Sequence, residues 1–230
     1  MKRIMTMTGF LLSFIIIISG AQVCFPSEIG DISPETITGR MTAMNGFVWR
    51  YGYDIGIKDG KVIVHVAINL IPAGGVTQLE LDRGKYAWER GIERIWSEKF
   101  SLVTPTGESY PIVIDAIFTG NRFHHDVIVR PGGGNSDELN WRLLNSPEIV
   151  AHEFGHMVGA FDEYRRGATA PQGEIIDSMS IMRGSPNGVS TYGRHYEGFR
   201  AWFINKTGLS AVSLIPNRME VGASGYPGER

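Results

Sequence analysis

Residues 148–164 read EIVAHEFGHMVGAFDEY, and the interpretation of the whole chain depends on this stretch. On a helix, His152 and His156 would lie one turn apart on one face, where both imidazoles can reach a single ion. Glu153 lies beside them. Metal-assisted hydrolysis requires three protein ligands, an open position for water and a base, and the H-E-x-x-H spacing supplies two ligands and the base. The third ligand must therefore come from another part of the chain.

Two further residues extend the pattern beyond the second histidine. Gly159 follows His156 by three positions, and Asp162 follows Gly159 by three more. A glycine in the left-handed conformation ends a helix and turns the chain back, which lets the next polar side chain approach the same ion. Asp162 is therefore the predicted third ligand, and the alternatives are Glu163, Glu174 and His195. An amphipathic helix with two solvated histidines is the alternative to a metal site.

The spacing H-E-x-x-H-x-x-G-x-x-H is the zinc signature of the metzincin metallopeptidases, and the chain matches it at His152, Glu153, His156 and Gly159. Asp162 replaces the last histidine, and in this the chain resembles the snapalysin-like branch. The resemblance implies an α+β, metzincin-like zincin fold with a twisted mixed β-sheet, a backing helix, an active-site helix, a Met-turn and a C-terminal helix. It also implies one Zn²⁺ per chain, held by His152, His156 and Asp162.

The same resemblance implies a methionine turn, in which a Met side chain forms an apolar floor under the histidines without binding the metal. Ser180-Ile181-Met182 is followed by the turn-prone residues RGSP, 183–186. Met182 is the predicted residue of this turn, and Met179 is a weaker alternative. Tyr192 and His195 follow the turn and are candidates for stabilising the oxyanion of the reaction.

The amino terminus reads as a secretory signal over residues 1–21. Lys2 and Arg3 form a charged start, residues 9–18 an apolar run, and Ser19-Gly20-Ala21 a cleavage site of small residues. An uncleaved anchor is the alternative, but the apolar run is short for a membrane span, so no stable membrane insertion is expected after cleavage. The expected location is therefore secreted or periplasmic.

The rest of the chain is expected to form one domain, since no internal repeat is visible. We expect an extended N-terminal arm over 22–46, a single catalytic domain over 47–216 and a mobile tail over 217–230. The only cysteine is Cys24, which excludes an intrachain disulfide. The formal charge of −2 gives no electrostatic reason for a nucleic-acid partner, so the expected partner is a protein or peptide substrate.

Hydrophobic periodicity predicts the remaining elements. Asp59-Gly60 is a strong hairpin signal between two strands, and Ser146-Pro147 is a strong helix start. A helix over 82–100 is expected to bury Tyr86, Ile92, Ile95, Trp96 and Phe100. The other expected elements are strands at 47–57, 61–71, 110–118 and 125–130, and a last helix at 195–206.

The triplet His124-His125-Asp126 opens the strand at 125–130. Neighbouring strand residues point to opposite faces, so a second metal site is not expected there. His65 is likewise interpreted as an ordinary sheet histidine. The resemblance to metzincins instead implies that the strand before the active-site helix lines the substrate groove and pairs with an extended peptide.

These observations predict an exported zinc endopeptidase that cleaves peptide bonds through a zinc-activated water, with Glu153 as general base. Two alternatives belong to other classes: a binding or structural module in which zinc is structural, and a zinc-dependent amidase or deacetylase. The intact Glu153 favours an enzyme, because a purely structural site has no need of a base.

Overall fold

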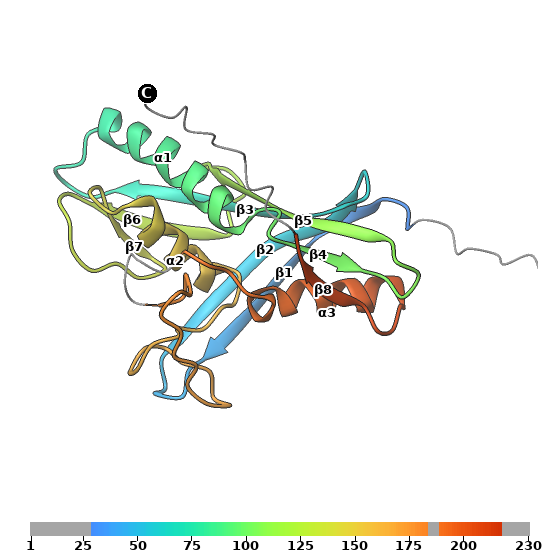
Figure 1. Cartoon of the computed structure of the whole chain (residues 1–230). Helices are drawn as coiled ribbons and strands as arrows, with labels where there is room; N and C mark the ends of the chain where they lie inside the picture. The colour runs from blue at the N-terminus through green and yellow to red at the C-terminus, as the bar shows by residue number, and fades with distance from the viewer. Residues whose placement is uncertain (1–28, 184–188, 218–230) are drawn as a thin grey trace, which may run out of the picture.

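The computed structural model describes residues 29–183 and 189–217 (Figure 1). The predicted signal segment lies outside these ranges, as do residues 218–230 of the predicted tail. The elements are β1 (Ile32–Thr42), β2 (Val48–Lys58), β3 (Lys61–Pro72), α1 (Gln78–Trp96), β4 (Phe100–Val103), β5 (Ser109–Phe118), β6 (His125–Arg130), β7 (Asn140–Arg142), α2 (Pro147–Met157), a 3-10 turn (Gly193–Tyr196), α3 (Glu197–Thr207) and β8 (Ser213–Pro216). The chain is therefore an α+β protein.

The strands form one curled mixed sheet with β3 at its centre. Along one edge β3 pairs in parallel with β5, and along the other it pairs first with β2, antiparallel, and then with β6, parallel. Because β6 takes the place of β2 after residue 68, the β1–β2 hairpin leaves the sheet and extends past α2, as Figure 1 shows. Trp49 at the far end of this hairpin donates from Nε1 to the His156 carbonyl at 3.0 Å. The hairpin thereby reaches the histidine-bearing helix.

The core lies on the face of the sheet that the helices cover. Alternation in β3 turns Val62, Val64 and Val66 into this core, while His65 faces outward and contacts Asp115 at 2.7 Å. α1 begins with a capping box between Thr77 and Glu80 and packs its buried side on the sheet. The predicted sheet histidine is thus part of the outer, solvent-facing side.

α1 and α2 approach each other closely at Gly91. A Cβ atom added at Gly91 would lie 2.3 Å from the Cβ and 3.2 Å from the Cα of Pro147, the first residue of α2. The glycine is therefore required by the contact between the helices, which places α2 over the sheet.

Replacing Gly91 with alanine is expected to destabilise the protein by up to about 2 kcal/mol in urea unfolding. Alanine gains roughly 1 kcal/mol of helix propensity, but overpacking against Pro147 typically costs about 1 to 3 kcal/mol. Gly198→Ala is the matched control, because a Cβ there meets nothing closer than the Tyr53 hydroxyl at 3.6 Å. If Gly91→Ala were as stable as Gly198→Ala, the close approach would have no energetic consequence.

Most predicted strands agree with the structure, but the expected N-terminal arm is wrong for residues 32–42. This segment is β1, which pairs antiparallel with β2 from Ile32 to Thr42 and belongs to the domain. The expected mobile tail is also wrong for Asn217, because its backbone N–H donates to the Lys99 carbonyl at 2.9 Å.

The first helix lies four residues earlier than predicted, over Gln78–Trp96. Phe100 therefore starts β4 and does not end the helix. Tyr86 is 64 % exposed, and its expected place in the core is taken by Trp88, which is 1 % exposed. Ile92, Ile95 and Trp96 are buried as predicted. The last helix starts at Glu197, after the 3-10 turn.

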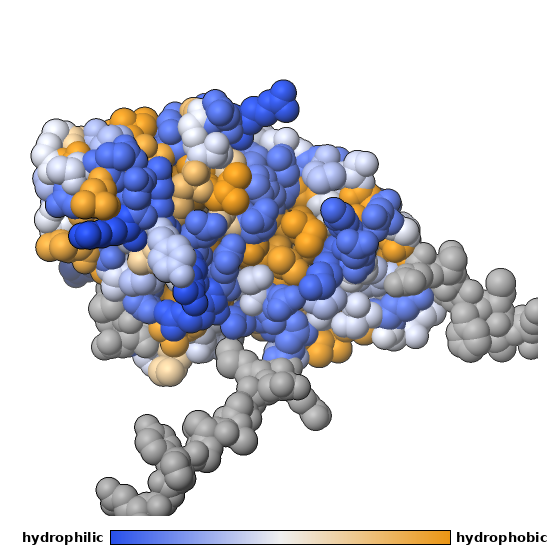
Figure 2. All heavy atoms as spheres, turned by 90° about the horizontal axis from the view of Figure 1, so that it is seen from above, coloured by the Kyte–Doolittle hydropathy of each residue, from blue (hydrophilic) through white to orange (hydrophobic). Residues whose placement is uncertain are grey.

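Within the described ranges, no helix combines the length and the apolar character needed to cross a membrane. On the face shown in Figure 2, hydrophobic patches are separated from one another by hydrophilic residues. The hydrophobic surface on this face, which is seen from above relative to Figure 1, is therefore not continuous.

Candidate metal centre

Helix α2 carries the H-E-x-x-H residues between well-defined ends. The Ser146 side chain caps the helix by accepting from the backbone N–H of Ile149, and Pro147 occupies the first turn. Beyond Met157, Gly159 has φ +94°, the positive value that the sequence predicts for a chain reversal. The reversal brings the segment that follows back over the histidines.

His152, His156 and Asp162 form a compact group whose potential ligand atoms all lie within 4.8 Å of one another. The Nε2 atoms of both histidines lie 3.3 Å from Asp162 Oδ1. This oxygen is buried and has no hydrogen-bond partner among the residues that the structure describes. Leaving a buried acceptor unpaired is costly, whereas a cation between the three atoms would satisfy it. The group therefore fits a metal ion.

The second polar atom of each ligand is held by the backbone. His152 Nδ1 contacts the Ile181 carbonyl and His156 Nδ1 the Ala160 carbonyl, both at 2.9 Å. Since a carbonyl only accepts, each Nδ1 carries the proton and each Nε2 offers its lone pair to the site. The backbone N–H of Ala168 donates to Asp162 Oδ2 at 2.6 Å. Two imidazoles and one carboxylate are a ligand set suited to Zn²⁺.

Glu153 is buried beside this group but is not a member of it. Burial raises the pKa of its carboxyl to about 7, His152 opposes this shift, and Asp162 adds to it. A bound cation would lower this value. Burial acts on Asp162 in the same direction, but its contacts with His152 and His156 hold its pKa well below the usual range. Asp162 is therefore suited to be an anionic ligand, and Glu153 to exchange a proton near neutral pH.

Met182 lies fully buried beneath α2, the helix that carries His152 and His156. A Cβ atom added at Gly155, between the two histidines, would lie 2.3 Å from Met182 Sδ and 2.9 Å from the Trp96 ring. The backbone N–H of Met182 donates to Ser180 Oγ at 3.1 Å. Met179 is 55 % exposed. Of the two candidate methionines, Met182 is the one that packs under the helix.

A cleft opens over the group, and Tyr164 is one of the residues in it that the sequence analysis missed. Its ring centroid lies 6.4 Å from that of His152. Burial raises the pKa of the Tyr164 phenol well above its usual value, and Asp162 and Glu153 add to the shift. The phenol is therefore a protonated donor. The cleft is lined by Asn45, Phe47, Trp49, Ser136, Asp137, Glu138, His152, Glu153, His156, Asp162, Tyr164, Arg166, Gly167 and Ala168.

The alternative third ligands lie away from the group. The Glu163 carboxylate contacts Arg194 and His195, and Glu174 is exposed. Burial opposes ionisation of Glu163, but these contacts lower its pKa to about 2. Tyr192 and His195, the candidates for stabilising an oxyanion, do not line the cleft. That expectation is therefore wrong, and Tyr164 is better placed for the role.

The strand expected to line the groove is also placed differently. β6 pairs with β3 over His125–Val129 and with β7 over Ile128–Arg130, so it is not an edge strand, and none of its residues lines the cleft. Residues 136–138, which precede β7, line the cleft instead. His124 Nδ1 accepts from the Ala67 backbone and His125 Nε2 contacts the Gly52 carbonyl, so the two rings do not share a site.

Comparison of the chain with protein-family models, curated proteins and solved structures found no match. The functional interpretation therefore depends on the residues of the site itself.

Proposed function

We propose that the protein is an exported zinc-dependent endopeptidase of the metzincin type, with a snapalysin-like aspartate as third ligand. The observation that carries this proposal is the buried Asp162 Oδ1, which lies 3.3 Å from both Nε2 atoms and has no hydrogen-bond partner within residues 29–183 and 189–217. Glu153, a carboxylate outside the ligand group, lies in the same open cleft. The α+β fold with a mixed sheet and Met182 beneath the metal helix are compatible with this type.

In this proposal His152, His156 and Asp162 hold the ion, and their backbone contacts fix the orientation of all three ligands. When bound, Zn²⁺ supplies Lewis acidity toward the scissile carbonyl and lowers the pKa of a water. Glu153 accepts the proton of the attacking water and later transfers it to the leaving amine.

Tyr164 has a separate role in the proposed reaction. Tyr164 lines the cleft, with its ring centroid 6.4 Å from that of His152. In the proposed reaction its phenol donates a hydrogen bond to the oxygen that gains negative charge at the attacked carbon. Phe47 and Trp49, beside the β1–β2 turn, also line the cleft, and in the proposed complex substrate side chains bind against them.

Replacing Tyr164 with phenylalanine is expected to lower kcat by about 10² to 10³-fold, the usual effect of removing one oxyanion donor. KM and zinc content should change little, because the phenol is not in the ligand group. Tyr86→Phe on the exposed side of α1 is the matched control and should keep full activity. An unchanged kcat in Tyr164→Phe would exclude the proposed donor.

The function itself is tested by the zinc content of the purified protein together with casein cleavage, with and without a chelator. About one zinc per chain and cleavage that the chelator abolishes are expected. Release of acetate or ammonia without peptide cleavage would instead identify a deacetylase or amidase. Bound zinc with four protein ligands and no exchangeable water would identify a structural site.

A further inference from the structure

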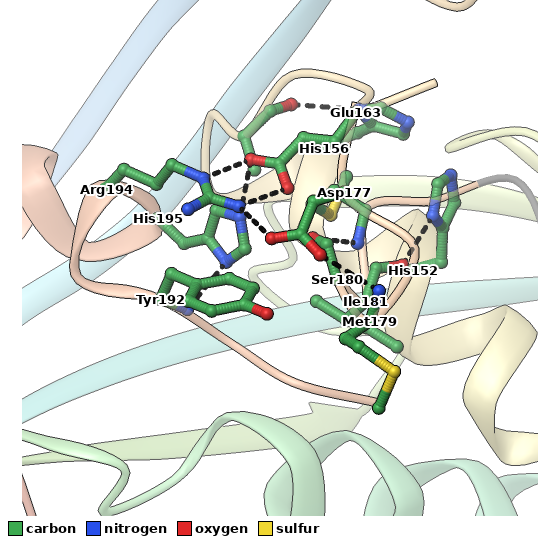
Figure 3. Close-up of polar contacts among 12 residues, drawn as sticks. His152, His156, Glu163, Asp177, Met179, Ser180, Ile181, Tyr192, Arg194 and His195 are labelled. Atoms are coloured by element: carbon green, nitrogen blue, oxygen red, sulfur yellow. Dashed lines mark hydrogen bonds and ion pairs between the residues drawn. The ribbon is translucent and has the colours of Figure 1, made fainter. Parts of the chain in front are cut away.

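An ion-pair cluster, in which Glu163 and His195 are buried and Arg194 is partly exposed, lies next to the third ligand in the chain. The Glu163 carboxylate is nearly inaccessible and receives both arms of the Arg194 guanidinium, with Nε at 2.5 Å from Oε1 and Nη2 at 2.7 Å from Oε2. His195 Nε2 lies 3.0 Å from the same Oε1. Figure 3 shows Arg194 and His195 meeting the Glu163 carboxylate, and Asp177 meeting the Arg194 guanidinium. None of these side chains belongs to the cleft or to the metal-ligand group.

The hydrogen-bond pattern fixes the roles of the partners. The Tyr192 backbone N–H donates to His195 Nδ1 at 3.2 Å, so Nε2 carries the proton and donates to Glu163. Arg194 also donates from Nη2 to Asp177 Oδ2 at 3.1 Å and lies 4.1 Å above the Tyr192 ring. The guanidinium is therefore held from three sides.

The backbone of Glu163 joins the cluster to the metal centre. Its N–H donates to the Met182 carbonyl at 2.8 Å, and its carbonyl accepts from the Asp177 backbone at 3.3 Å. The preceding residue is the ligand Asp162, and the residue before Met182 is Ile181, whose carbonyl holds His152 Nδ1. Through these bonds the cluster is connected to the segment that carries Asp162 and to the turn whose Ile181 carbonyl orients His152. Asp162 and His152 are two of the three ligands.

Regular secondary structure does not hold the segment around Asp162 and Met182 in place. No helix or strand is assigned in residues 158–183 or 189–192, so the segment that carries Asp162 and Met182 lacks a regular hydrogen-bond ladder. Buried ion pairs contribute little net stability, because desolvation offsets their attraction. What the two-armed Arg194–Glu163 contact does supply is fixed geometry.

We propose that Glu163, Arg194 and His195 are positioning residues that hold the Asp162 segment and the Met182 turn against α2, and thereby set the affinity of the centre for its divalent cation. This inference rests on the proposed function only in requiring that the centre binds a metal. It does not depend on which bond the protein cleaves.

The test measures Zn²⁺ and Co²⁺ affinity by competition with a chromophoric chelator in Glu163→Gln and Arg194→Lys. Glu163→Gln keeps the side-chain size but removes the charge, whereas Arg194→Lys keeps the charge but loses the two-armed contact. Each is expected to bind both ions about 10- to 100-fold more weakly, the usual effect of losing a support outside the ligand sphere. The visible absorption of the Co²⁺ protein, which reports ligand geometry, should also change.

Glu35→Gln and Arg200→Lys are the matched controls, because they make the same substitutions in ion pairs elsewhere in the fold. Glu35 accepts from Trp202 and pairs with Lys206, and Arg200 pairs with Glu197. Both controls should retain the wild-type metal affinity and Co²⁺ spectrum.

The possible outcomes separate this inference from the proposed function. If the melting temperature of the metal-free variants falls while their metal affinity stays at the wild-type value, the cluster only stabilises the fold and the inference is overturned. A wild-type protein that binds neither ion would overturn both proposals. A wild-type protein that binds zinc without cleaving peptides would remove the peptidase, while weaker binding in Glu163→Gln and Arg194→Lys would still support the positioning role.

Discussion

Replacing Glu153 with glutamine is expected to lower kcat by about 10² to 10⁴-fold, the usual contribution of a general acid–base group, while the metal stays bound. The neutral amide has nearly the same shape, so it preserves the packing of this buried side chain, but it cannot accept a proton. Because Glu153 is not one of the three grouped ligands, the affinity for zinc should change little. The loss should therefore be confined to turnover.

The measurement is kcat on a peptide substrate together with zinc content for the same preparation. Glu148→Gln is the matched control, because Glu148 lies on the same helix, outside the cleft, and pairs with Arg94 at 2.6 Å. That pair is largely exposed on the Arg94 side and is worth no more than about 1 kcal/mol, so activity should persist. Loss of zinc from Glu153→Gln would mean that this carboxylate is a ligand, and full activity would exclude it as the base.

Local sequence signals predicted the elements that carry this chemistry. Ser146 and Pro147 mark the start of α2, and Gly159 follows its end within a few residues. Each of these residues acts through its own side chain or its own backbone geometry. The Asp59-Gly60 turn is equally local, with positive φ at both residues as a tight hairpin requires. Such signals are readable because no distant contact is needed to produce them.

The errors in the fold arise where distant contacts determine the outcome. β1 is an edge strand with no fully buried residue, and its half-buried positions include Glu35 and Gly39. Its sequence therefore shows no hydrophobic alternation, and only pairing with β2 defines it. In α1, Tyr86 and Trp88 are two positions apart and point to different sides of the helix. Gly91 decides between them, because it is where α2 approaches, and a glycine adds nothing to a hydrophobic pattern.

The same reasoning explains what was missed at the site. Trp49 lines the cleft and bonds to the His156 backbone 107 residues away, a contact that depends on the hairpin leaving the sheet. Arg194 and Glu163 are 31 residues apart and carry no periodic pattern. Tyr164 is only two positions after Asp162, so its proximity was a usable signal, but its direction into the cleft depends on the turn at 164–168.

Replacing Asp162 with asparagine is expected to weaken zinc binding by at least about 100-fold, beyond the 10- to 100-fold typical of residues that only support a ligand. Asparagine keeps the side-chain volume and still offers an oxygen to the Ala168 N–H, so the loop should keep its conformation. The substitution removes the negative charge of the carboxylate, whose Oδ1 lies 3.3 Å from the Nε2 atoms of both imidazoles. The fold of the metal-free protein should therefore be little affected.

This combination gives a clear thermodynamic readout. At a free zinc concentration about 100 times the wild-type Kd, binding stabilises the wild-type protein by about 2.7 kcal/mol, but a variant with 100-fold weaker affinity gains only about 0.4 kcal/mol. Unfolding with zinc and with a chelator measures both values. Glu138→Gln is the control, since Glu138 lines the same cleft without belonging to the ligand group, and its zinc-dependent gain should approach that of the wild type. Equal gains in wild type and Asp162→Asn would remove Asp162 from the metal centre, and with it the residue on which the proposed resemblance to the aspartate branch of the metzincins depends.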